Sequence, residues 1–267
     1  MNARPRDLIG AVRVGDAPRL RRLLRRGATV DAPDPFGATA LVWAARRGDR
    51  VSARALLAAG ADANARTRAG ETALAAAARA GHRALTRLLL KAGATIDAAD
   101  VVGDTPLRAA IEERHQALAV RLLEAGADPA RVDSSGRTPL MWAAEWDAPR
   151  VARALIARGV DIEARDGRGR TVLHLACAVS RSRTARVLIG AGADVEARML
   201  DGSTPLMAAA STGDTKLVRD LLAAGADREA RDARGHSARD IAREHEFDDV
   251  YWALGDDEEG DGDEDEV

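Results

Sequence analysis

Residues 133–165 read DSSGRTPLMWAAEWDAPRVARALIARGVDIEAR, and this stretch decides the fold because its pattern recurs along the chain. Thr138 can accept a backbone N–H at a helix start, and Pro139 follows at the first helical position, where its missing donor costs nothing. A short helix carrying Leu140 and a second helix opened by Pro149 place small and aliphatic side chains on one side. The stretch therefore predicts two short helices followed by a polar, Gly-rich turn or hairpin.

The pattern repeats every 33 residues without an insertion or deletion. A Thr or Ser followed by Pro, Ala or Val recurs at Thr39, Thr72, Thr105, Thr138, Thr171, Thr204 and Ser237. A glycine keeps the same step at Gly27, Gly60, Gly93, Gly126, Gly159, Gly192 and Gly225, and so does an aliphatic pair. Repeat positions in register predict a stack of similar units, each packed only on its neighbours.

These features resemble the ankyrin-repeat family. Its pattern of Thr-Pro-Leu-His, paired alanines, Leu-Leu and Gly-Ala-Asp is visible in residues 100–107, 171–176 and 221–227. The resemblance covers about residues 6–254 and implies an all-α ankyrin-repeat solenoid, with two helices and a hairpin loop in each repeat. It implies a capping half-repeat at 1–33, six full repeats at 34–231, a capping repeat at 232–255 and then a disordered acidic tail at 256–267.

Several positions depart from the family pattern. Arg114, Asp147 and Ser180 replace the glycine between the two helices in the middle repeats. Because side chains other than Gly avoid the left-handed conformation, these repeats are expected to turn differently or to be locally less stable. Thr67 and Met199 replace the leading Asp of two hairpins, which is expected to weaken them.

Composition limits the possible classes of protein. Apolar residues make up 46% of the chain but aromatics only 3%, which suits close helix packing better than a deep ligand pocket. Of the 40 basic residues all but Lys91 and Lys216 are Arg, a bias typical of a GC-rich genome, so a bacterial source is the working hypothesis. Cys177 is the single cysteine, which excludes an intrachain disulfide. The N-terminus lacks an apolar run of signal-peptide length and the chain lacks a membrane-length run, so we expect a cytoplasmic monomer.

The residues that could carry catalysis or bind a metal are scattered. His174 and Cys177 lie one helical turn apart, but both occupy repeat positions that ordinary packing residues fill elsewhere. His82 and His115 stand where the family places a hydrogen-bonding histidine in the turn, so the resemblance implies a structural role. No Gly-rich phosphate loop is present. The sequence predicts no enzyme activity, no cofactor and no metal site.

The family binds its partners on the concave side, with the hairpin tips and the exposed positions of each first helix. Carried over by repeat position, this implies binding by Trp146, Glu145, Glu112, Glu113, Arg46, Arg47, Arg79, Arg137, Arg168, Arg170 and Val179. Further tip positions are Phe36, Arg68, Glu71, Val101, Val102, Asp104, Leu200 and Asp201. Trp43 and Trp142 are assigned to the core.

Trp146 is the most informative of these residues. With Arg137, Arg168 and Arg170 nearby it is interpreted as an interface anchor, since Trp and Arg dominate binding hot spots. The alternative is that its ring folds over Pro149 and shields a turn that has lost its glycine.

The charge of the same face changes sign, from Arg46, Arg47 and Arg79 to Glu112, Glu113 and Glu145. An alternating face favours a protein partner over nucleic acid, which needs a continuous basic stripe. Binding of nucleic acid by the Arg-rich first helix pair remains an alternative, set against a plain solvated cap. A chain that binds a protein partner in this way is expected to be an adaptor, an inhibitor or immunity-type protein for an enzyme, or an effector. The acidic tail serves solubility or competes with an acidic partner for the basic body.

Overall fold

The structure, a computed structural model, describes residues 5–179 and 182–255. The chain forms two compact units, Met1–Trp142 (unit 1) and Ala143–Val267 (unit 2). The regular elements of the described residues are short α-helices, joined by tight turns and by hairpin loops with isolated bridges. The predicted all-α ankyrin-repeat arrangement is confirmed.

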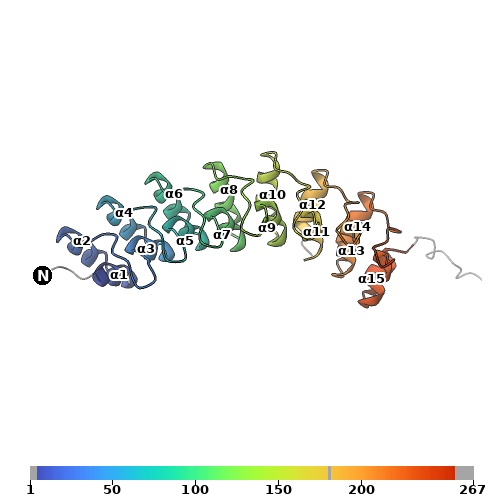
Figure 1. The fold of residues 1–267 in the computed structure, drawn as a ribbon, viewed down its shortest axis with the longest axis horizontal. Coiled ribbons are helices and arrows are strands. Elements are labelled where there is room, and N and C mark those ends of the chain that lie inside the picture. The colour runs from blue at the N-terminus through green and yellow to red at the C-terminus, as the bar shows by residue number, and fades with distance from the viewer. Residues whose placement is uncertain (1–4, 180–181, 256–267) are drawn as a thin grey trace, which may run out of the picture. The chain divides into compact units, whose positions relative to one another are not determined.

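Unit 1 consists of helix pairs, one pair to a repeat. Its helices are α1 (Pro5–Val14), α2 (Ala17–Arg25), α3 (Ala40–Arg47), α4 (Arg50–Ala58), α5 (Ala73–Arg79), α6 (Arg83–Lys91), α7 (Pro106–Glu112) and α8 (Gln116–Glu124). The odd-numbered helices form one row, here called inner, and the even-numbered helices form a second, outer row (Figure 1). The inner helices α1, α3, α5 and α7 pack in sequence, as do the outer helices α2, α4 and α6, and the two helices of each pair pack on each other.

Unit 2 repeats this arrangement. Helix α9 (Pro139–Glu145) begins in unit 1 and ends in unit 2, and it is followed by α10 (Pro149–Ile156), α11 (Val172–Cys177), α12 (Ser182–Gly190), α13 (Pro205–Ala210), α14 (Thr215–Ala223), α15 (Ala238–Glu244) and α16 (Asp248–Ala253). Inner helices α11, α13 and α15 pack in sequence, as do outer helices α10, α12, α14 and α16.

Hydroxyl caps start the inner helices, as the recurring Thr or Ser predicts. The Thr39 side chain accepts the backbone N–H of Val42, and Thr72 caps α5 in the same way. Ser237 forms a capping box, because Asp240 also accepts the backbone N–H of Ser237. These caps fix where each short helix begins, which a helix of six to eight residues could not do by propensity alone.

Alanine and leucine fill the core of each unit. In unit 1 Ala44 and Ala45 of α3 are fully buried, and their small side chains let α3 approach its neighbours. Leu56 of α4 and Leu89 of α6 are equally buried between the two rows. Truncation of such a leucine to Ala typically costs about 2–5 kcal/mol, so each repeat depends on a few side chains.

The turns between inner and outer helices keep one conformation despite the sequence changes. Gly48 ends α3 in the left-handed region at φ 70°. Arg114 and Asp147 adopt the same region, at φ 59° and 47°. The first alternative, a different turn, is therefore wrong at both positions, and the second, a local loss of stability, stays a prediction. Ser180 lies outside the described residues.

Asp147 also links two repeats of unit 2. Its carboxylate accepts hydrogen bonds from the Arg183 guanidinium, at 2.9 and 2.6 Å, and from the Thr184 hydroxyl at 3.1 Å. Both donors belong to α12, so the side chain at the α9–α10 turn bridges to the next outer helix.

The hairpins close even where the leading Asp is missing. Thr67 donates its backbone N–H to the Glu71 carbonyl and Met199 donates to Ser203, each at 3.0 Å. The Asp34 side chain braces its hairpin by accepting two backbone N–H groups, whereas the Thr67 hydroxyl accepts only that of Glu71. The substitutions leave the closure intact and reduce the side-chain bracing.

The N-terminal end of the stack has the polar surface predicted for a cap. The side chains of Arg19, Arg21, Arg22, Arg25 and Arg26 are all exposed.

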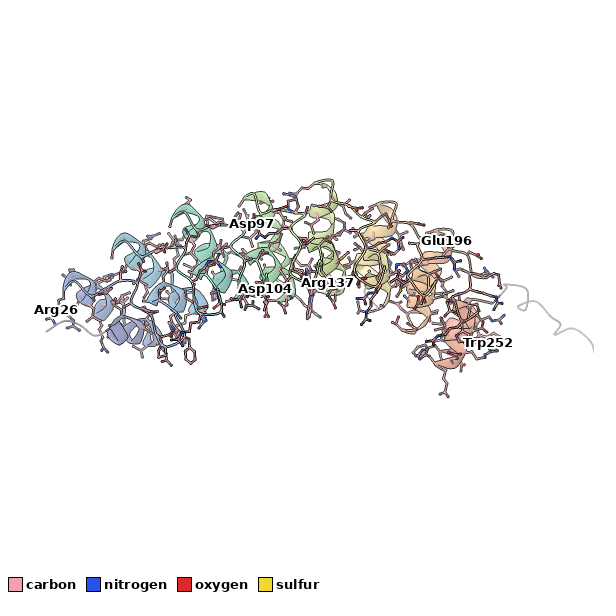
Figure 2. All side chains as sticks on the ribbon, viewed as in Figure 1. Arg26, Asp97, Asp104, Arg137, Glu196 and Trp252 are labelled. Carbon is pink, nitrogen blue, oxygen red and sulfur yellow. The ribbon has the colours of Figure 1, made fainter. Side chains whose placement is uncertain are left out.

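The C-terminal helix buries aliphatic side chains and leaves its tryptophan exposed. Val250 and Leu254 of α16 are buried, while Trp252 is 68% exposed (Figure 2). Because successive residues turn by about 100° around a helix, Trp252 lies opposite Val250 and faces away from the core. Phe247 instead covers Gly213 of the preceding turn. The acidic tail predicted at 256–267 lies outside the described residues.

In the part of the chain that the structure describes, no helix is both long enough and apolar enough to cross a membrane.

Candidate partner-binding face

The hairpins and the exposed side of the inner helices form one face in each unit, here called the inner face. In unit 1 this face is built by hairpins 34–38, 67–71, 100–104 and 133–137 beside α1, α3, α5 and α7. Each hairpin is closed by a backbone hydrogen bond from its first residue to its fifth, with N···O distances of 3.0 to 3.1 Å.

Successive hairpins are tied to each other. The backbone N–H of Arg68 donates to the Phe36 carbonyl at 2.9 Å, and that of Val101 donates to Ala69 at 3.1 Å. The Ser134 hydroxyl donates to the Val102 carbonyl at 2.6 Å. The tips of unit 1 therefore form a continuous, hydrogen-bonded row and do not behave as independent loops.

Large apolar side chains project from this row. Phe36 is 74% exposed and Val101 72% exposed, and Val102 beside it is exposed as well. In unit 2 the tip residue Leu200 is 82% exposed, and its backbone N–H donates to the Arg168 carbonyl at 3.4 Å. Apolar side chains that are exposed together on a rigid edge are typical of a protein-binding surface.

Trp43 packs against the hydrophobic core of unit 1 but is only partly buried, so the prediction of a core residue is confirmed in part and the rest of the ring lies on the inner face. Its ring is partly exposed, and its indole N–H donates to the Asp34 carboxylate at 2.9 Å. The guanidinium groups of Arg13 and Arg46 lie 5.0 and 5.1 Å from the ring centroid. The ring is therefore held between two cations and a carboxylate at the edge of the hairpin.

Trp142 has the same surroundings three repeats later. Its indole N–H donates to Asp133 at 2.9 Å, and Arg108 and Arg137 lie 4.1 and 3.9 Å from its ring centroid. The nine-residue spacing from Asp34 to Trp43 and from Asp133 to Trp142 is the signal in the sequence that could have identified both sites. Stacking on Trp142 also gives Arg137 a partner other than Trp146.

The two carboxylates are tuned by these contacts. Burial raises the pKa of Asp34, but the hydrogen bonds from Trp43 and from two backbone N–H groups outweigh it, so the pKa lies below its usual value. The same balance of burial and hydrogen bonds lowers the pKa of Asp133. Both side chains are therefore ionised at neutral pH and hold the tryptophans by charge-assisted hydrogen bonds.

Ion pairs compensate much of the predicted change of sign along the inner face. Arg46 pairs with Glu71 at 2.6 Å. Arg79 lies 3.7 Å from both Asp104 and Glu112. Among the residues predicted to bind a partner, Arg47 and Glu113 are exposed, whereas Glu112 is half-buried. A partner would therefore meet a face that is largely neutralised locally.

The predicted residues of unit 2 are only partly exposed. Arg168 is exposed at its tip and Val179 is exposed after α11, but Arg170 donates to Asp166 at 2.8 Å. Trp146 and Glu145 are half-buried at the end of α9. Both interpretations of Trp146, anchor or shield, are compatible with this position.

His174 and Cys177 are built into the core of α11. The ring nitrogens of His174 contact Thr171 and, at 3.1 Å, the Ser203 carbonyl. Cys177 is fully buried, and this burial raises the pKa of its thiol far above the usual value. Within the described ranges, no three His, Cys, Asp or Glu side chains gather to hold a metal ion. The ring Nε2–H groups of His82 and His115 donate to the carbonyls of Arg46 and Arg79, as expected for structural histidines.

Comparison with known proteins agrees with the geometry. The family model for ankyrin repeats, in three copies, matches residues 8–100, 97–166 and 158–232. The human ASB11 ankyrin repeat domain, a solved structure, matches with a TM-score of 0.73 and 30% sequence identity, covering 81% of this chain and 96% of that one. No curated protein matches the chain.

Proposed function

The chain belongs to the ankyrin-repeat family, whose members are generally non-catalytic interaction modules, and on this premise we propose that it is a protein-binding scaffold that uses its inner face. The row of hydrogen-bonded tips bearing Phe36, Val101 and Val102 carries the proposal. A rigid edge loses little conformational freedom on binding, so exposed apolar area there contributes efficiently to affinity.

The tryptophan sites add specificity in unit 1. Arg and Trp are the residues that most often dominate binding energy at protein interfaces. The partly exposed ring of Trp43 beside the Arg13 guanidinium offers a flat surface onto which a partner's carboxylate or apolar side chain can pack, while Arg46 is already paired with Glu71. Arg47 and Glu113 contribute charge that can select the orientation of the partner.

The inner face of unit 2 is proposed as a binding surface in its own right. Trp146 is proposed as its anchor, with Glu145, Arg168, Arg170 and Val179 on that unit. Trp146→Ala separates the two interpretations: an anchor loses roughly 2 kcal/mol of binding with thermal unfolding nearly unchanged. Retained binding together with a large fall in thermal stability would instead assign Trp146 to shielding the turn.

The test of the main proposal is affinity capture from lysate of the native cells with three full-length proteins. Val101→Ser removes an exposed apolar tip while keeping its backbone hydrogen bond to Ala69. Val132→Ser is the matched control, since Val132 is also exposed but is not a tip residue. We expect one dominant protein to be recovered by the wild type and the control, and to be depleted at least about tenfold by Val101→Ser.

Two results contradict this proposal. One is recovery that is equal in all three proteins. The other is recovery that disappears after nuclease treatment regardless of Val101, since this would assign the chain to nucleic-acid binding.

The finer assignments belong to the same proposal. They are the absence of enzyme activity, an adaptor or inhibitor role in a bacterial cytoplasm, a monomeric state, and the boundaries at 1–33, 34–231, 232–255 and 256–267. Light scattering coupled to size-exclusion chromatography measures the oligomeric state directly. Inhibition of the captured enzyme would select the inhibitor role over the adaptor role.

A further inference from the structure

Three of the four outer helices of unit 1, α2, α4 and α6, carry charge of one sign. Helices α2, α4 and α6 contain no Asp or Glu within their bounds. Their basic residues are Arg19, Arg21, Arg22, Arg25, Arg50, Arg54, Arg83, Arg87 and Lys91. This outer face therefore differs from the inner face, where the arginines of α3, α5 and α7 contact carboxylates.

Three of these arginines are in register. Arg21, Arg54 and Arg87 follow one another at steps of 33 residues, and all three side chains are exposed. Their helices are neighbours, since α4 packs on both α2 and α6 (Figure 1). Packed helices lie about 8–10 Å apart, so this row presents one guanidinium at roughly that interval.

Grooves between the outer helices combine these cations with aliphatic surface. The groove between α2 and α4, of about 430 Å³, is lined by Arg21, Arg50 and Arg54 together with Val51, Ala55 and Ala58. Val51 is 52% exposed in it. A groove between α6 and α8 also combines cations with aliphatic surface, with Arg83, Arg87 and Arg121 beside Leu90 and Leu118, but Glu124 lines it as well, so the purely basic part of the face is that of α2, α4 and α6.

We propose that the outer face of α2, α4 and α6 is a second docking surface, which binds an acidic protein segment carrying aliphatic side chains. Carboxylates of such a segment can pair with Arg21, Arg54 and Arg87, while its aliphatic side chains cover Val51 and the alanines of the groove. Complementary charge accelerates and orients the association, and apolar contact adds affinity that charge alone does not give.

The same features disfavour nucleic acid as the occupant. Proteins that bind single strands supply aromatic side chains on which bases stack, and α2, α4 and α6 contain none. Aliphatic groove floors offer nothing to a phosphate backbone, whereas they fit a leucine or valine side chain.

The test uses the full-length chain and a fluorescent peptide of four Glu-Glu-Leu-Gly repeats, with anisotropy measured at low salt. One variant combines Arg21→Gln, Arg54→Gln and Arg87→Gln. Its control combines Arg131→Gln, Arg158→Gln and Arg234→Gln, which removes the same charge at exposed positions outside α2, α4 and α6. We expect the first triple variant to bind the peptide at least roughly tenfold more weakly than the wild type, and the control to change affinity less than about threefold.

Two further arms identify the class of ligand. A peptide with Ser in place of each Leu is expected to bind several-fold more weakly, and Val51→Ser is expected to abolish this difference. Equal affinity of the wild type and the first triple variant for the Leu peptide overturns the proposal. So does a 20-base-pair DNA duplex that binds more tightly than the peptide and loses its affinity in that variant. Loss of Val101-dependent capture leaves these outcomes unchanged, because the two surfaces lie on different rows of helices.

Discussion

Gly48 and Gly60 both adopt a backbone conformation that favours glycine, but only at Gly48 would a side chain also collide with a neighbouring residue. Both have positive φ, 70° and 86°. A Cβ at Gly60 would meet nothing within 4 Å, whereas a Cβ at Gly48 would lie 2.7 Å from the His82 ring. That ring covers the turn of the preceding repeat and reaches the Arg46 carbonyl at 3.4 Å.

The expected magnitudes follow from these distances. Gly60→Ala places a side chain in the left-handed region, which costs about 1–2 kcal/mol, partly offset by the lower entropy of the unfolded chain. Gly48→Ala carries the same cost and must also displace the His82 ring, and overpacking of this kind costs about 1–3 kcal/mol. We therefore expect Gly48→Ala to destabilise the chain by about 1–3 kcal/mol more than Gly60→Ala.

The assay is urea unfolding of the full-length proteins, followed by circular dichroism and by the fluorescence of the four tryptophans. A second pair of measurements compares His82→Ala with the double variant Gly48→Ala, His82→Ala. Without the imidazole, the added cost of the Gly48 substitution should fall to that of Gly60→Ala. Equal destabilisation by Gly48→Ala and Gly60→Ala in the wild-type background would refute the argument that His82 occupies the space above the turn.

Three other perturbations test separate contacts. Asp147→Asn should lower the free energy of unfolding in urea by no more than about 1 kcal/mol, since the Arg183 side chain that pairs with Asp147 is largely exposed. Because salt screens an exposed ion pair, 1 M salt should reduce this difference, and a difference that salt leaves unchanged would contradict the ion pair. The pKa of Asp34 is lowered in the folded chain, so its stabilising effect is fully present above the usual pKa of 3.8 and is lost as pH falls through the lower folded value. The free energy of unfolding of the wild type should therefore exceed that of Asp34→Asn by less on acidification below about pH 4. A difference that grows there would contradict the argument. Cys177 is buried with a raised pKa, so a thiol reagent should modify the native chain no faster than the chain unfolds, and rapid stoichiometric modification without denaturant would show that α11 is open.

The sequence predicted the repeat architecture because its signals are local. A Thr at each 33-residue step marks the start of an inner helix, and the structure places the side chains of Thr39, Thr72 and Thr105 on the backbone N–H groups that open α3, α5 and α7. N-capping depends on four consecutive residues, such as Thr39 to Val42, and can be recognised in any unit.

The conformation at Arg114 could not be predicted in the same way. Propensity disfavours a left-handed arginine, yet the packing of α7 on α8 requires that turn. The conformational preference of one residue contributes less free energy than the packing of the two helices that it joins.

The candidate site was predicted in outline only. Repeat position identified the tips at Phe36 and Val101, both of which are exposed. It assigned Trp43 to the core because a short helix offers few positions to separate a buried side from a half-buried one. Repeat position also did not predict the pairing of Arg46 with Glu71, because a separation of 25 residues in the sequence does not by itself indicate a contact.

The contacts that join neighbouring repeats have a consequence for synthesis of the chain. They connect residues from 25 positions apart, as in Arg46 with Glu71, to 37 apart, as in Asp147 with Thr184. A repeat emerging from the ribosome therefore finds its partners in the repeat made just before it, and the entropy lost in closing each such loop is nearly the same at every step. Repeats can therefore fold one after another from the N-terminal end during translation, and only the repeat made last lacks a neighbour on its C-terminal side.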